Sequence, residues 1–286
     1  MTASAPAAAG TAAACPLCGS TAAAPVERIP YAAVWEALST VWGARFSEGV
    51  VRRHSPARDA VLVECGGCGL RHFAGAVAGD AEFYAELSGS SDYYVPGKWE
   101  FGVVRDRLAA GRDVLDVGCG DGDFLRVVAG TAARAVGIDT NPDAVARGAA
   151  RGLDVRLAEL DAFAAAHPAE FDLVCSFHVL EHLPSVRGFV ASMLACLRPG
   201  GSLVVSVPNR LRARPAPGLE PLDCPPHHMS RWHPRQFAEM ASSFGLELVR
   251  VDAQPADMWE CRSAVRLRAE RLLRPVAGGR AAHAVG

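Results

Sequence analysis

Short apolar runs alternate with stretches of helical periodicity between about residues 101 and 252. Apolar runs bounded by turn residues predict buried strands, and apolar positions three and four apart predict helices. We predict strands at 113–117, 135–138, 155–157, 171–177, 202–207 and 246–252, and helices at 101–110, 123–129, 142–151, 186–197 and 234–244. This alternation indicates an α/β fold, with βαβ units that build a doubly wound, mostly parallel sheet with helices on both faces.

The flanking segments have a different texture. Residues 15–79 carry two cysteine pairs, and residues 80–100 form a polar and aromatic bridge. The Ala-rich start lacks the basic segment and apolar core of a signal peptide, so we expect a flexible tail and a cytoplasmic protein. We therefore divide the chain into a tail at 1–14, a small cysteine-bearing module at 15–79, a linker or lid at 80–100, a core at 101–254, and a C-terminal extension at 255–286 with a disordered end.

Composition and charge narrow the class of protein. Half of the residues are hydrophobic and 21% are charged, which argues against global disorder. The formal net charge of −2 excludes a strongly basic protein wrapped around nucleic acid, although Arg-rich stretches remain at 45–58 and 262–274. Because no apolar run reaches the roughly 18 residues of a membrane span, we expect no membrane partner. The oligomeric state stays open.

Four of the nine cysteines form two matched CxxCG pairs. Cys15 and Cys18 make the first pair, and Cys65 and Cys68 make the second. A CxxC turn places two thiolates within reach of one ion, and the glycine after it relieves the tight turn. Because four thiolates leave no open coordination position, the pattern predicts structural Zn²⁺ rather than a catalytic ion. A redox pair or incidental thiols are the alternatives.

A loop with three glycines follows the first predicted strand of the core and precedes a helix. Glycines there permit positive φ and a close approach of the backbone to a ligand. The loop lacks the Lys-Ser/Thr end of a phosphate loop, and Asp123 stands where a dinucleotide loop has its third glycine. Asp116 and Asp121 disfavour a pyrophosphate and suit a nucleoside with a cationic substituent. Asp139, at the end of the second strand, can accept both ribose hydroxyls.

The segments VLDVGCGDGDFL, GIDTNPDAV, FDLVCSFHVLEHL and LRPGGSLVVSVPN resemble, in this order, the motifs of class I S-adenosylmethionine-dependent methyltransferases. The resemblance covers about residues 100–252. It implies a Rossmann-like sheet of seven strands, S-adenosyl-L-methionine as the cofactor, and methyl transfer to an acceptor. The cysteine pairs are similar to the zinc-ribbon-like N-terminal module of a subset of bacterial small-molecule methyltransferases, including sugar-modifying ones.

The resemblance also implies which residues bind the cofactor. Asp139 would hold the ribose hydroxyls, and Thr140 and Asn141 would flank the adenine. Glu159 and Leu160 match an acidic and apolar pair at the adenine edge. The residues that would line the methionine side and the sulfonium are Asp116, Gly118, Gly120, Gly122, Phe177 and His178.

Aromatic residues before the first core strand are candidates for a cover over the cofactor. Related enzymes use this segment in that way, and aromatic rings near a sulfonium contribute cation–π attraction. We therefore predict that Tyr94 and Trp99 contact the cofactor, with packing between the two modules as the alternative.

Histidines after the fourth core strand and in the Pro- and Arg-rich loop at 210–231 are candidates for chemistry. Methyl transfer requires alignment of the acceptor with the methyl group and, for a hydroxyl or carbon acid, removal of a proton. We predict that His178 or His228 acts as a general base or orients the acceptor, and that His182 makes a structural hydrogen bond. In some relatives an acid-histidine cluster here binds a divalent cation, but His178 replaces one acidic position of that pattern.

Three functions are open at this point. The leading one is methyl transfer to a small-molecule acceptor, in natural-product or sugar biosynthesis. The second is an RNA methyltransferase whose zinc module grips RNA, against which the net charge and the single lysine count. The third is a non-catalytic zinc interaction protein, against which the intact glycine loop and Asp139 count.

Overall fold

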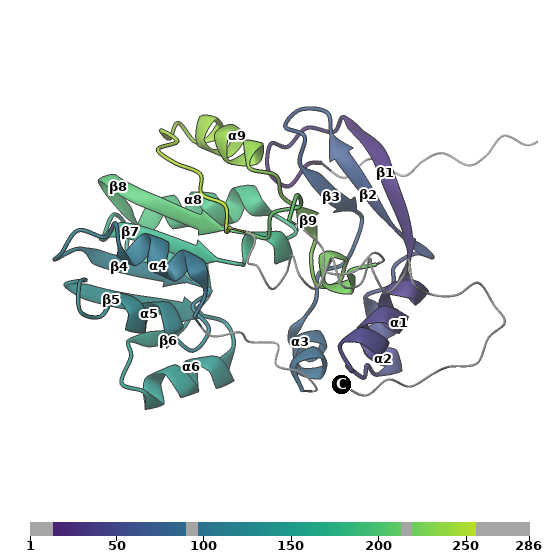
Figure 1. Ribbon diagram of the computed structural model, residues 1–286, viewed down its shortest axis with the longest axis horizontal. Helices are drawn as coiled ribbons and strands as arrows, with labels where there is room; N and C mark the ends of the chain where they lie inside the picture. The colour runs from purple at the N-terminus through teal and green to yellow at the C-terminus, as the bar shows by residue number, and fades with distance from the viewer. Residues whose placement is uncertain (1–13, 90–96, 213–218, 256–286) are drawn as a thin grey trace, which may run out of the picture.

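A computed structural model describes residues 14–89, 97–212 and 219–255. Figure 1 shows two sheets side by side, a five-stranded one in the C-terminal part and a four-stranded one built mainly by the N-terminal part. The predictions for the tail, for Tyr94 and for residues 256–286 fall outside the described residues. No helix in the described ranges is long and apolar enough to cross a membrane.

The five-stranded sheet is parallel throughout, with the order β6-β5-β4-β7-β8. Its strands are β4 (Asp113–Val117), β5 (Arg134–Asp139), β6 (Val155–Leu157), β7 (Phe171–Phe177) and β8 (Leu197–Ser206). The two central strands, β4 and β7, are buried along most of their length, as expected for strands covered on both faces. The chain order reverses between them, and in open α/β sheets ligands bind at the carboxyl ends of the strands beside this reversal.

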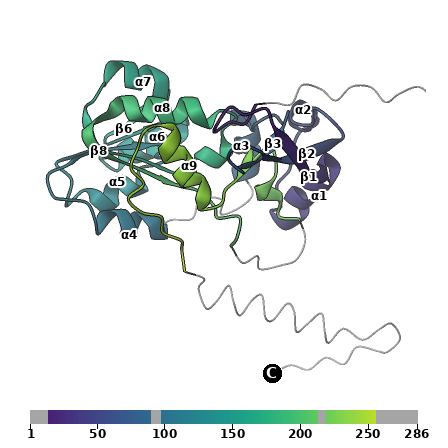
Figure 2. The same ribbon diagram turned by 90° about the horizontal axis from the view of Figure 1, so that it is seen from above.

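Helices cover both faces of the parallel sheet (Figure 2). α4 (Trp99–Arg105) and α5 (Asp123–Val128) pack on one face around the buried Phe124. α7 (Leu160–Ala166) and α8 (Val186–Cys196) pack on the other face. α6 (Pro142–Ala150) follows β5, and α9 (Arg235–Ser243) follows the long insertion after β8.

The four-stranded sheet is antiparallel, with the order β1-β2-β3-β9. Its strands are β1 (Ala23–Pro30), β2 (Asp59–Cys65), β3 (Arg71–Ala74) and β9 (Ser230–Arg231). The helices α1 (Tyr31–Val41), α2 (Glu48–Arg53) and α3 (Ala81–Ser88) share its hydrophobic core. β9 belongs to the insertion after β8, so this insertion returns to complete the N-terminal sheet.

A third hydrophobic cluster joins the two parts of the molecule. It brings Leu17 and Leu70, beside the cysteine pairs, against Val186 and Val190 of α8 and Trp232 of the insertion. Polar contacts cross the same boundary, and some of them involve the CxxC turns themselves. The amide of Arg187 donates to the carbonyl of Pro16, and the side chain of Gln236 donates to the carbonyl of Cys68.

The structure confirms the doubly wound α/β class but not the number of strands. Among the described residues the parallel sheet has five strands rather than seven, and the segment predicted as a strand at 246–252 lies in no strand. The side chain of Val249 is 86% exposed, and β8 forms the edge of the sheet. A strand without a neighbour leaves its backbone groups unpaired, so apolar alternation alone does not produce one.

The bridge predicted as a linker or lid contains regular structure. α3 buries Phe83 and Leu87 in the core of the N-terminal sheet, and Asp80 caps its first turn by accepting from the amide of Phe83. α4 begins at Trp99, after Lys98. The first half of the bridge thus belongs to the N-terminal core, and a covering function stays a prediction for the remainder.

Candidate active site

The glycine loop follows β4, and its backbone is fixed by its neighbours. The amides of Gly118 and Cys119 both donate to the carbonyl of Ile138 in β5. Gly118, Gly120 and Gly122 all have positive φ. A Cβ on Gly118 would lie 2.5 Å from a methyl group of Val179, whereas a Cβ on Gly120 would meet no heavy atom within 4 Å. The loop is therefore packed at Gly118 and open at Gly120.

Asp139 shapes this loop. One oxygen of its carboxylate accepts from the amide of Gly120 at 2.8 Å, and the other accepts from the amide of Asn141 at 2.8 Å. A carboxylate has about four lone-pair positions, so two amides leave capacity for ribose hydroxyls. The sequence-based function of Asp139 is compatible with this geometry, and the structure adds a second one, positioning of the glycine loop.

Asp116 is buried beneath the loop, at 2% exposure. Among the described residues its Oδ1 has no hydrogen-bond partner. Burial raises the pKa of Asp116 to about 7, with Lys98 opposing the shift and Asp139 adding to it. A buried acidic oxygen without a partner is costly unless a ligand satisfies it, and a cationic group is the ligand that suits it. The glycine loop, Asp116 and Asp139 therefore fit S-adenosylmethionine.

The remaining predicted cofactor residues have mixed surroundings. Thr140 and Glu159 are exposed, and Leu160 is buried in the sheet core. The side chain of Asn141 caps α6 by accepting from two amides of its first turn. Phe177 packs between Phe101 and Phe124, with ring centroids 5.0 and 4.7 Å away, so its ring lies in the core. Their contacts with a cofactor stay predictions, as does that of the half-buried Trp99.

His178 follows β7 directly and pairs with a residue that the sequence did not single out. Its Nε2 lies 2.6 Å from Oε1 of Glu100 in α4, and its Nδ1 lies 3.4 Å from Oε1 of Glu181. Burial lowers the pKa of His178, but the contacts with Glu100 and Glu181 outweigh it and raise the pKa to about 9. His178 is therefore protonated at neutral pH and cannot accept a proton there. Its φ of +57° is also unusual for a residue other than glycine.

The insertion after β8 places two histidines against the end of β7. The amide of Met229 donates to the carbonyl of Glu181 at 2.6 Å and so ties the insertion to the short helix η1 (Leu180–His182). Nδ1 of His182 lies 2.8 Å from the carbonyl oxygen of His227. The rings of His182, His227 and His228 lie 4.4 to 4.8 Å apart by their centroids.

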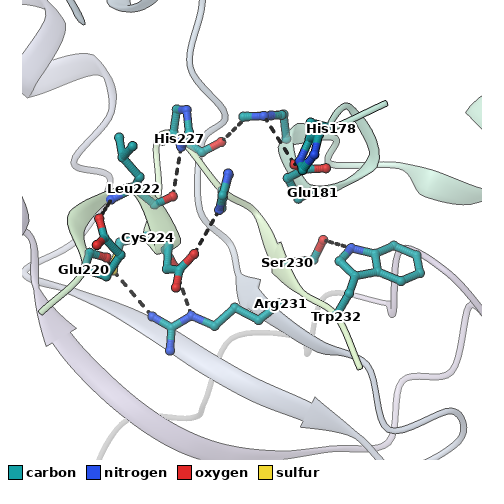
Figure 3. Close-up of polar contacts among 12 residues, drawn as sticks. His178, Glu181, Glu220, Leu222, Cys224, His227, Ser230, Arg231 and Trp232 are labelled. Atoms are coloured by element: carbon teal, nitrogen blue, oxygen red, sulfur yellow. Dashed lines mark hydrogen bonds and ion pairs between the residues drawn. The ribbon is translucent and has the colours of Figure 1, made fainter. Parts of the chain in front are cut away.

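Other residues of the insertion after β8 contact His227 and His228. Figure 3 shows His227 above Leu222, and the Arg231 guanidinium beside Cys224. Nδ1 of His228 lies 3.3 Å from Oδ1 of Asp223, and the Arg212 guanidinium donates to that same oxygen. Burial raises the pKa of Asp223, but His228 and Arg212 outweigh it and hold the pKa far below its usual range. The predicted roof thus presents His228 on an ionised carboxylate.

The two cysteine pairs converge at the boundary between the two parts. Sγ of Cys15 lies 3.6 Å from Sγ of Cys68, and Sγ of Cys18 lies 3.5 Å from Sγ of Cys65. All four sulfurs lie within 4.8 Å of one another. These separations exceed a disulfide bond of about 2.05 Å and approach the edge of a tetrahedron of sulfurs about 2.3 Å from a central Zn²⁺. The thiol set therefore fits one tetrahedral zinc ion.

Glu100, Tyr84 and Asp223 were missed as site residues by the sequence analysis. Tyr84 places its hydroxyl 2.9 Å from Nδ1 of His182, and Glu100 and Asp223 pair with the two predicted catalytic histidines. Each comes from a segment far from its partner along the chain or from an irregular loop. Of the three, only Asp223 could have been found from local sequence, because it lies within five residues of His227 and His228.

The comparisons with known proteins agree with this geometry. A family model described as a methyltransferase domain matches residues 100–251, which is more than half of the chain. The chain belongs to this family of methyltransferase domains. The match begins at Glu100 and includes the glycine loop and His178.

Named relatives are methyltransferases as well. A Mycolicibacterium smegmatis protein named "Probable S-adenosylmethionine-dependent methyltransferase" is 38% identical over 154 residues, covering 51% of this chain and 57% of that protein. A ubiquinone biosynthesis O-methyltransferase of Thiobacillus denitrificans is 40% identical over 107 residues, covering 35% of this chain and 46% of that protein. The chain thus spans about half the length of these relatives. A crystal structure of an S-adenosylmethionine-dependent methyltransferase from Mesorhizobium loti is similar at 22% identity and a TM-score of 0.47, covering 63% of this chain and 94% of that one.

Proposed function

We propose that this protein transfers a methyl group from S-adenosylmethionine to a small-molecule acceptor. The observation that carries the proposal is the buried Asp116 carboxyl with its unsatisfied oxygen, beneath a glycine loop that is open at Gly120. The cationic sulfonium and amino groups of the cofactor would add to the nearby charge of Lys98 and would provide the direct partner that this oxygen lacks among the described residues. The bound cofactor supplies the methyl group.

We place the acceptor beside His178 and the short helix η1, at the carboxyl end of β7. The chain after β7 passes from His178 into η1, and the insertion covers η1 through the bond from Met229 to Glu181. A small molecule suits this covered position better than a polymer does. The relatives named ubiquinone biosynthesis O-methyltransferases favour a hydroxyl acceptor, and natural-product or sugar biosynthesis is a suitable setting.

The two predicted catalytic histidines receive different functions. His178 is an imidazolium held by Glu100, so we assign it orientation and electrostatic stabilisation rather than proton removal. His228 is oriented by Asp223, an arrangement that fixes the tautomer and aims Nε2. We assign His228 to the acceptor, either to take its proton or to orient it. The Cys₄ cluster takes no part in the chemistry and would hold a structural Zn²⁺.

Calorimetric titration with S-adenosylmethionine tests the cofactor assignment. Wild type should bind it, and Asp139→Ala should weaken binding by about 1.5–3 kcal/mol because ribose hydroxyls and the Gly120 amide lose a charged acceptor. Asp106→Ala, an acidic change just after the end of α4 and outside the site, is the matched control and should bind like wild type. Equal affinity in wild type and Asp139→Ala would remove Asp139 from the site, and no binding by wild type would overturn the function.

The acceptor can be found by untargeted comparison of metabolites in a deletion strain and its parent. A product that disappears on deletion, while a precursor lighter by one CH₂ group accumulates, identifies the reaction. Purified protein should then methylate the accumulated precursor. Failure of both observations alongside tight cofactor binding would favour a protein that binds the cofactor without turnover.

A further inference from the structure

Three buried or half-buried imidazoles converge beside the candidate active site, apart from the cysteine cluster. One ligand nitrogen from each of His182, His227 and His228 lies within 4.8 Å of the other two. His182 comes from η1, and the other two come from the insertion after β8. His227 and His228 are 4% and 7% exposed, so the cluster is buried rather than a chance grouping of surface side chains.

Hydrogen bonds fix the tautomer of each ring. Nδ1 of His182 lies 2.8 Å from the carbonyl of His227, and Nδ1 of His227 lies 2.8 Å from the carbonyl of Leu222. Nδ1 of His228 faces the Asp223 carboxylate. Carbonyl and carboxylate oxygens only accept, so each Nδ1 carries a hydrogen and each Nε2 is the nitrogen with the lone pair. Histidines that bind metals are oriented in the same way, with the other ring nitrogen donating to a carbonyl or carboxylate.

The charges around the cluster call for a cation. Glu181 is 1% exposed, and among the described residues neither of its carboxylate oxygens has a hydrogen-bond partner. Its Oε1 lies 3.8 Å from Nε2 of His182. The ring of His178 lies between two carboxylates, but Glu100 lies closer to it, at 2.6 Å, than Glu181 does, at 3.4 Å. The buried Glu181 therefore shares this ring with the half-buried Glu100, and a buried carboxylate without full compensation is costly.

We propose that His182, His227 and His228 bind one divalent transition-metal ion, with Glu181 as a further ligand or as its counter-charge. Imidazole nitrogens suit Zn²⁺, Fe²⁺, Co²⁺ and Ni²⁺ rather than Mg²⁺ or Ca²⁺. With Glu181 as the counter-charge, three protein ligands leave an open position, unlike the closed set of four cysteines. This set of ligands differs from the acid-histidine cluster of some relatives, because it does not use residue 178. Two of its ligands come from the insertion after β8.

A function for the ion at the acceptor rests on the proposed methyl transfer. In that case the open position would take an oxygen of the acceptor, and His228 would orient the acceptor through the ion rather than take its proton. Metal binding itself requires neither cofactor nor acceptor, so its test is independent of the proposed function.

The experiment is a titration of the untagged, full-length, metal-free chain with Co²⁺, followed by its electronic spectrum and by metal analysis. A Cys₄ site gives intense thiolate-to-metal charge-transfer bands, whereas a histidine site gives only weaker d–d bands. Two equivalents are expected, one of each type. Saturation at a single, thiolate-bound equivalent in wild type would overturn the proposal without any variant.

Three variants locate the second equivalent. His228→Gln should lower its affinity by at least about 100-fold, and Asp223→Asn, which removes the charge of the carboxylate that faces Nδ1 of His228 and pairs with Arg212, by about 10–100-fold. His233→Gln, in the same segment but outside the cluster, should bind like wild type. The thiolate bands report in each sample whether the chain has folded. Unchanged affinity for the second equivalent in folded His228→Gln would refute the assignment, and the Asp223→Asn titration decides if His228→Gln does not fold.

Discussion

The imidazole of His178 and the carboxylate of Glu100, 2.6 Å apart, connect the end of β7 to α4 across the mouth of the parallel sheet. The hydroxyl of Ser206, at the end of β8, lies 3.4 Å from the same carboxylate oxygen. The pair therefore fixes the position of the segment before the first core strand relative to the ends of two strands. It also converts a predicted general base into a fixed cation.

This pair should make stability depend on pH. The pKa of His178 is raised from 6.5 to about 9 in the folded state, so its stabilising contribution is complete below about pH 6.5 and is lost as the pH rises toward 9. Urea unfolding at several pH values should show wild type losing stability over this window. His178→Asn, which tolerates the positive φ, should be less stable at pH 6 and should lose less between pH 6 and 9. Parallel curves for the two proteins would contradict the ion pair.

Cofactor binding should depend on the protonation of Asp116. Its pKa of about 7 leaves it largely neutral below that pH, and a cationic ligand favours the ionised form. The affinity for S-adenosylmethionine should therefore rise with pH up to about 7, by at most about tenfold per pH unit. Asp116→Asn should bind more weakly and remove this part of the pH dependence. Calorimetry at pH 5.5, 6.5 and 7.5 measures both, and an unchanged slope in the variant would exclude Asp116 as the cause.

Two glycines of one loop should respond differently to alanine. At Gly120 a Cβ meets open space, so Gly120→Ala should cost only the strain of a left-handed residue, about 1–2 kcal/mol, and should reduce cofactor affinity. Gly120→Val should reduce it further. At Gly118 a Cβ would displace Val179, so Gly118→Ala should destabilise the fold by more than Gly120→Ala does. Thermal melting and calorimetry separate the two effects, and equal melting points would contradict the packing at Gly118.

Removal of the predicted zinc should affect both parts of the molecule. Metal analysis should find about one zinc ion fewer per chain in Cys65→Ser/Cys68→Ser than in wild type. The cysteines share a hydrophobic cluster with Val186 and Val190 of α8, so the chelated protein should gain hydrogen exchange in α8 as well as in β2 and β3. Cys196→Ser, at a cysteine outside the cluster, is the control for zinc content. Exchange confined to residues 15–79 would show that the two parts are not coupled.

The local sequence was sufficient to predict those elements whose residue pattern lies within a single short segment. The limits of β4, β6 and β7 are those predicted. For β4 and β7 the reason is that buried strands of a parallel sheet are largely apolar runs with clear ends, whereas the three-residue β6 lies at the edge of the sheet. The glycine loop and both CxxCG pairs were visible because their chemistry depends on fixed spacing. The seven-residue helix α7 was not predicted, and the apolar segment after α9 was wrongly predicted as a strand. Whether the apolar segment after α9 forms a strand depends on a neighbouring strand with which it can pair. The local sequence does not show which strands pair.

The sequence by itself determined the fold class, the position of the glycine loop and the two cysteine pairs. Only the tertiary structure decided that the insertion after β8 completes the N-terminal sheet through β9, and that its His227 and His228 meet His182. The reason is physical: a spacing motif is set by local chain geometry, whereas a contact between distant segments depends on how they pack. The protonation of His178 was also decided by the tertiary structure, because it depends on the Glu100 carboxylate that the fold places beside the ring.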